Sequence, residues 1–68
     1  MAIEHLNIAI DFSPNDADAY LNRGRTYRSV NDFQAAIADF RQALNNSKNG
    51  NWIHAAAEEE LSSLGVSE

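Results

Sequence analysis

The sequence predicts an all-α fold, an α-solenoid in which four helices pack as antiparallel hairpins. Two observations support this class. Apolar residues recur at three- and four-residue spacing in four successive segments, which is typical of helices with one buried face. A shift of 34 residues also superposes the chain on itself, and a period of that length with two helices per unit indicates stacked helical repeats.

Length and composition narrow the classes of function. Sixty-eight residues suffice for one small domain, and the absence of Cys excludes disulfides and thiolate zinc sites. The net charge of −5 argues against a nucleic-acid partner, because phosphate binding usually needs a basic patch. No apolar run reaches the roughly 20 residues that span a bilayer, and no basic leader is visible. We therefore expect a cytoplasmic protein without a membrane partner.

The first predicted helix spans Ala2–Phe12. Its apolar stripe consists of Ile3, Leu6 and Ile10, spaced by three and four residues. Pro14 ends this helix, because proline disfavours the helical conformation in the residue before it and donates no backbone hydrogen bond.

Residues 17–44 are predicted to form the central helical hairpin. Asn15 or Asp16 can cap its first helix, which runs to about Ser29. The second helix of the hairpin covers residues 32–44. The turn between them is too short for anything but antiparallel neighbours.

The three glycines have distinct predicted roles. Gly24 lies inside a helix, where glycine costs about 0.5–1 kcal/mol relative to Ala, so we expect a neighbouring helix to approach it closely. Gly50 is expected to be left-handed in the polar loop that precedes a fourth helix over residues 52–64, and Gly65 ends that helix. Trp52 opens this helix, and packing over the core is favoured over a role in an interface.

The repeat has a specific residue pattern in the central hairpin. Aromatic and small residues occur at fixed offsets, at Tyr20, Gly24, Tyr27, Ala36, Phe40 and Ala43. This pattern resembles the tetratricopeptide repeat family, in which small residues let helices approach closely and aromatic residues fill the space between them. The resemblance implies one domain with a half repeat over 1–14, a complete repeat over 17–50, and a capping half repeat over 51–68.

Two positions depart from the family pattern. Arg23 replaces an aliphatic residue, so we expect its stem to pack and its charged head to reach solvent. Glu58 occupies the position of the family glycine, which argues against close packing of a following helix and favours a terminal cap with a polar face. Glu59 and Glu60 are expected to face outward with it.

The resemblance implies a protein–protein interaction or scaffold module. In the family, the first helix of each repeat lines a concave groove that holds a peptide or partner protein. On this chain, the implied groove floor consists of Asp18, Asn22, Arg25, Arg28 and Ser29. The planar fork of arginine suits carboxylates, so we expect an acidic partner. The competing interpretation is a solvated face with intrahelical pairs, such as Asp18 with Asn22.

Self-assembly is the alternative function. The first helix lacks the helix that precedes it in the repeat pattern, so part of its apolar stripe is predicted to be bare. A two-fold homodimer is expected to use Ile3, Leu6, Ile8 and Ile10. Each buried aliphatic side chain contributes roughly 1.5–3 kcal/mol. In a variant of self-assembly, the helix over residues 52–64 of one chain completes the hairpin of the first helix in another, but Glu58 argues against tight packing there. The competing interpretation is a monomer with a loosely packed first helix.

The sequence predicts no enzyme, no cofactor and no metal site. It contains no recognisable nucleophile–base set and no glycine-rich phosphate loop. His54 and Glu58 lie one helical turn apart, but two ligands are too few to hold a metal. We expect these two residues and His5 to be surface groups.

Overall fold

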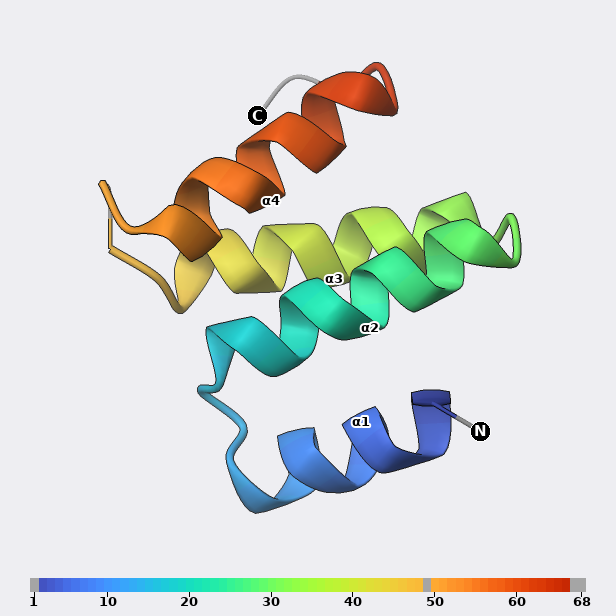
Figure 1. The fold of residues 1–68 in the computed structure, drawn as a ribbon, viewed down its shortest axis with the longest axis vertical. Helices are drawn as coiled ribbons and strands as arrows, with labels where there is room; N and C mark the ends of the chain where they lie inside the picture. Colours follow the sequence, from blue (N-terminus) through green and yellow to red (C-terminus); the bar gives the residue numbers. More distant parts are fainter. Residues whose placement is uncertain (1, 49, 67–68) are drawn as a thin grey trace.

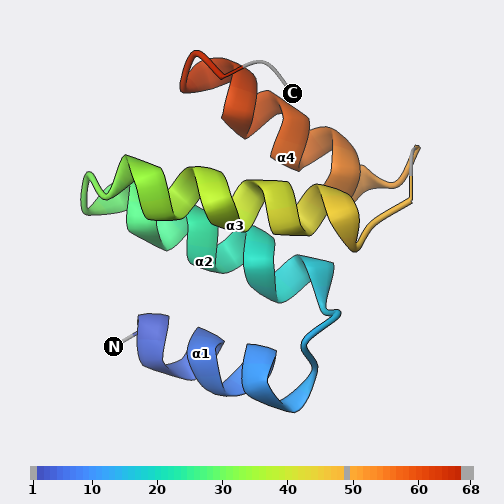
Figure 2. The ribbon, with the colours of Figure 1, turned by 180° about the vertical axis from the view of Figure 1, so that it is seen from behind.

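The computed structural model describes residues 2–48 and 50–66, with side chains from Glu4 onward. The described residues contain four helices, α1 (Ala2–Phe12), α2 (Ala17–Ser29), α3 (Phe33–Asn45) and α4 (Trp52–Ser63). Successive helices pack as antiparallel neighbours, with α2 and α3 as the central pair and α1 and α4 outside them (Figures 1 and 2). The predicted all-α arrangement of helix hairpins is thereby confirmed.

Polar side chains fix the start of three helices. The Asp16 carboxylate accepts hydrogen bonds from the backbone N–H groups of Asp18 and Ala19, at 3.1 and 3.3 Å. Asp32 and Asn51 cap α3 and α4 in the same way. These side chains satisfy backbone donors that have no partner within the helix, which explains why the predicted helix starts agree with the structure to within one residue.

Gly24 is the point of closest approach between α2 and α3. A Cβ atom placed on Gly24 would lie 2.6 Å from Cε1 of Phe40, closer than real Cβ atoms come to such a neighbour. Phe40 is fully buried and forms the centre of the core together with Leu21 and Leu61. The predicted role of Gly24 is confirmed, because the Phe40 ring occupies the space that a side chain would fill.

The remaining turns also follow local chemistry. Gly50 has a φ angle of +92°, which confirms the predicted left-handed conformation, and Gly65, after the end of α4, has a φ of +80°. Asn31 adopts a φ of +65° in the turn between α2 and α3, a conformation that asparagine tolerates better than most residues.

The prediction that Trp52 packs over the core is wrong. Its side chain is 63% exposed at the first position of α4. Trp52 lies nine positions before the buried Leu61, which places the two side chains on opposite sides of the helix. None of the helices in the described part of the chain is long and apolar enough to cross a membrane.

Candidate functional site

A groove between α1 and α2 contains three of the residues predicted for partner binding. Asn22, Arg25 and Ser29 line it from α2, and the other predicted residues, Asp18 and Arg28, lie outside it. The groove has a volume of about 610 Å³, and its remaining lining residues are His5, Leu6 and Thr26. Five of these six side chains are polar, and Leu6 is the one apolar member of the lining.

Arg25 in the groove lining and Arg28 outside it share one carboxylate. Nε of Arg25 donates to Oε2 of Glu60 at 3.2 Å, and Nη1 of Arg28 donates to Oε1 of the same residue. Arg28 also donates to the Ser63 hydroxyl at 2.9 Å. The expectation that Glu60 faces outward is wrong, because its side chain turns toward α2 and is only 16% exposed. These contacts join α2 to α4, so the arginines are not held by pairs within their own helix.

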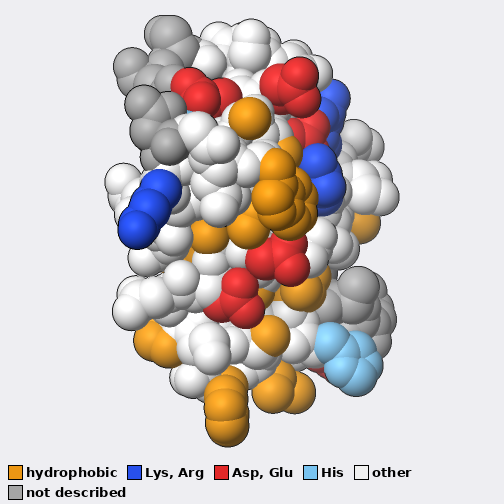
Figure 3. Space-filling model, turned by 60° about the vertical axis from the view of Figure 1, so that its left-hand side comes forward, with side chains coloured by type: hydrophobic (Ala, Val, Ile, Leu, Met, Phe, Trp, Pro, Cys, Tyr) orange, Lys and Arg blue, Asp and Glu red, His pale blue; other side chains and the backbone are white. Residues whose placement is uncertain are grey.

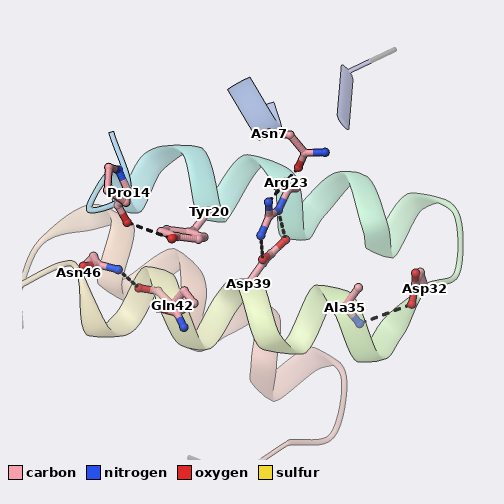
Figure 4. Close-up of polar contacts among 9 residues, drawn as sticks. All are labelled: Asn7, Pro14, Tyr20, Arg23, Asp32, Ala35, Asp39, Gln42 and Asn46. Carbon is pink, nitrogen blue, oxygen red and sulfur yellow. Dashed lines mark hydrogen bonds and ion pairs between the residues drawn. The ribbon is translucent and has the colours of Figure 1, made fainter. Parts of the chain in front are cut away.

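Arg23 connects three helices (Figure 4). Its guanidinium makes a two-pronged contact with the buried carboxylate of Asp39 on α3, at 2.7 and 2.8 Å, and donates to Oδ1 of Asn7 on α1 at 2.9 Å. The hydrogen bond to Asp39 raises the pKa of Arg23, although burial acts in the opposite direction. The rings of Tyr20 and Tyr27 flank the guanidinium at 5.7 and 5.9 Å from its carbon.

The expectation that the Arg23 head reaches solvent is therefore wrong. The physical reason is Asp39, which is only 4% exposed and provides both oxygens to the guanidinium. A buried carboxylate needs a charged partner, so the arginine head is held between the helices while its stem packs. The cluster links α1 to the central hairpin, and this fixes one wall of the groove.

The family model of the tetratricopeptide repeat matches residues 17–49. These residues form a tetratricopeptide repeat. Searches of curated proteins and of solved structures found no match. The repeat consists of α2, α3 and the start of the following loop, and a repeat of this family suggests a protein-interaction module.

The groove lies where the repeat meets α1, and sequence reasoning missed part of it. Thr26 was not considered, although it follows Asn22 by four residues and therefore shares its helix face. His5 was expected to be a simple surface group, but this exposed residue forms part of the groove wall. Asp18 and Ser29 are both exposed, as a groove floor requires, but Asp18 lies outside the groove lining.

The residues predicted for self-association have different environments. Ile8 is 66% exposed, Leu6 is half-buried, and Ile10 is only 8% exposed. Ile10 thus packs within the chain. The side chain of Ile3 lies outside the described residues. Phe12 was not among the predicted contacts, but it is 89% exposed, and Figure 3 shows hydrophobic side chains projecting from the α1 end of the molecule.

A second hollow lies between α3 of the repeat and α4. It has a volume of about 390 Å³ and is lined by Arg41, Leu44, Asn45 and His54. Nδ1 of His54 lies 3.2 Å from the Ser47 hydroxyl, and its Nε2 lies 3.6 Å from a Glu58 oxygen. In the part of the chain that the structure describes, no three His, Asp or Glu side chains are grouped closely enough to hold a metal ion.

Proposed function

We propose that this protein is an interaction module that binds an acidic segment of a partner protein along α2. The binding residues are Asn22, Arg25 and Ser29 in the groove, with Arg28 and Asp18 at its edges. The observation that carries the proposal is the shared carboxylate, because two guanidiniums pair with the single side chain of Glu60. One positive charge at this surface is therefore left to be balanced, and a partner carboxylate would balance it.

The charge distribution directs an acidic partner to this surface rather than to the rest of the molecule. The chain as a whole carries a net charge of −5, so acidic proteins are repelled from most of its surface. Arg25 is the more accessible of the two arginines, with half of its side chain exposed, and it both lines the groove and contacts Glu60. It can therefore turn toward an incoming carboxylate while Arg28 retains Glu60.

The flanking segments complete the proposed module. In this arrangement, residues 1–14 form a half repeat that supplies the second wall of the groove, and residues 51–68 form a capping half repeat. Glu58 supports the capping role, because it is exposed on α4 at the position that corresponds to Gly24. The cap also supplies Glu60, which holds Arg25 and Arg28 in place.

A binding titration with a fluorescent, glutamate-rich peptide tests this proposal. The variant Arg25→Glu should weaken binding at least about tenfold, because a hydrogen bond to a charged group contributes roughly 1.5–3 kcal/mol. Arg41→Glu is the matched control, since Arg41 is an exposed arginine on α3 outside the groove. Equal weakening by both variants would show only a loss of overall charge and would contradict the proposed site.

A two-fold homodimer through the outer face of α1 is the second candidate. The exposure of Ile8 and Phe12 favours it, because the two lie on one side of the helix, four residues apart. Sedimentation of the wild type and of Phe12→Asp tests this candidate. A mass that reaches twice that of the chain and falls to one chain in the variant would support the dimer.

A further inference from the structure

A shift of 34 residues relates the α1–α2 groove to the surface that α3 and α4 form together. In this molecule α2 packs against that second surface. All six residues that line the groove have counterparts 34 positions later in the chain, and four of these counterparts contact α2. Those four pairs are His5 with Asp39, Leu6 with Phe40, Thr26 with Glu60, and Ser29 with Ser63. The groove walls formed by α1 and α2 are thus repeated by α3 and α4.

Each of those four counterparts contacts α2. The Asp39 carboxylate accepts a hydrogen bond from Arg23, and the Phe40 ring lies against Gly24. Glu60 and Ser63 both accept hydrogen bonds from Arg28. The α3–α4 surface is therefore occupied by α2, whereas no helix of the described residues lies in the equivalent groove of α1 and α2.

The open groove favours a helix whose charges differ from those of α2. It carries His5 in place of Asp39 and Thr26 in place of Glu60, so both carboxylates that pair with the arginines of α2 are absent. A helix with arginines at those places would bring its positive charges next to Arg25 without a balancing acid. A helix with carboxylates there would instead meet Arg25 and hydroxyl donors.

The chain itself contains a helix with no cation and one carboxylate at the places of the three α2 arginines. The α4 residues that lie 34 positions after Arg23, Gly24, Arg25 and Arg28 are Ala57, Glu58, Glu59 and Ser62. Two carboxylates thus stand where α2 has a glycine and an arginine, and α4 has no Lys or Arg. Glu58, Glu59 and Ser62 are exposed, so this face of α4 is accessible to a second molecule.

Side-chain size is also complementary. The close contact of Gly24 with the Phe40 ring leaves no room for a larger residue at position 24. In the open groove, the counterpart of Phe40 is Leu6, which has no ring and is half-buried. Glu58 cannot approach a ring such as that of Phe40, so it opposes packing against a further copy of α3, but the smaller Leu6 leaves room for its side chain.

We propose that α4 of one copy docks into the α1–α2 groove of a second copy, so that the copies associate head to tail. The contact uses different surfaces on the two molecules and therefore leaves a free groove and a free α4 at the ends of every complex. It differs from the two-fold dimer, which uses the outer face of α1, and it needs no additional partner.

Charge reversal in the full chain tests this docking by sedimentation equilibrium. In the register of the repeat, the contact of Arg25 with Glu60 corresponds to a contact of Glu59 with Thr26 of the next copy. Thr26→Glu places two carboxylates together, and Glu59→Arg places a cation near Arg25. We expect each variant to sediment as a single chain at concentrations where the wild type associates, and the double variant to associate again.

Gln34→Glu adds the same charge at an exposed position on α3 and should leave the wild-type association unchanged, while circular dichroism verifies that each variant is folded. Wild-type mass should increase with concentration beyond two chains. A wild type that stays a single chain at high micromolar concentration would overturn the proposal. So would association that Phe12→Asp abolishes and that both charge reversals leave intact.

Discussion

Helices α1 and α3 occupy equivalent positions in the repeat register, but their surroundings differ. α3 packs between α2 and α4, whereas α1 packs against α2 alone in the described part of the chain. Phe40 and Ala43 are completely buried on α3, while their counterparts Leu6 and Ala9 are only half-buried on α1. A helix with one neighbour thus retains an open side, and in this chain that side forms the groove.

The outer faces of the two helices differ as well. Gln42 on α3 is exposed and polar, as expected for the outer side of a repeat, but its counterpart on α1 is Ile8. Phe12 likewise corresponds to Asn46, which donates to the Gln42 carbonyl at 2.9 Å. The apolar residues on the outer face of α1 are therefore not required by the repeat pattern, which makes them a separate surface from the groove.

The largest effect is expected from truncating the core of α3. Phe40→Ala should lower the free energy of unfolding by about 3–5 kcal/mol, since the ring is fully buried. The equivalent truncation on α1, Leu6→Ala, should cost only about 1–2 kcal/mol, because Leu6 is half-buried. Urea denaturation followed by circular dichroism measures both changes. Equal costs would contradict the difference between the two helices.

A smaller effect is expected from the ion pair between Arg23 on α2 and Asp39 on α3. Asp39→Ala should destabilise the protein by about 3 kcal/mol, because it leaves the Arg23 head without its main partner between the helices. Asp32→Ala is a useful comparison, since it removes an exposed carboxylate that caps α3 and should cost about 1 kcal/mol. Thermal unfolding measures which of the two variants loses more stability. A larger loss of stability for Asp32→Ala than for Asp39→Ala would exclude the proposed role of Asp39.

The smallest effect is expected on the outer face of α1. Phe12→Ser should change the free energy of unfolding by no more than about 0.5 kcal/mol, because the side chain is 89% exposed. The same denaturation measurement applies. A loss above 1 kcal/mol would mean that Phe12 packs within the chain and would remove it from the exposed surface.

Local patterns in the sequence were sufficient to predict the helices and their hairpins. Asp16 and Asp32 carry their capping information in single side chains, and the Gly24–Phe40 contact follows from the spacing of small and aromatic residues. The contacts that shape the site join residues far apart in the chain. Arg23 pairs with a carboxylate 16 positions later and Arg25 with one 35 positions later, and neither pairing is visible in helical periodicity.

The most direct test of the proposed function is an NMR titration of the full chain with the glutamate-rich peptide. The structure predicts that the largest changes in backbone amide shifts occur at Asn22, Arg25 and Ser29, because these residues line the groove beside the surplus positive charge. The amide of Arg41, in the hollow between α3 and α4, should change little. Changes centred on Arg41, or no changes at saturating peptide, would contradict binding along α2.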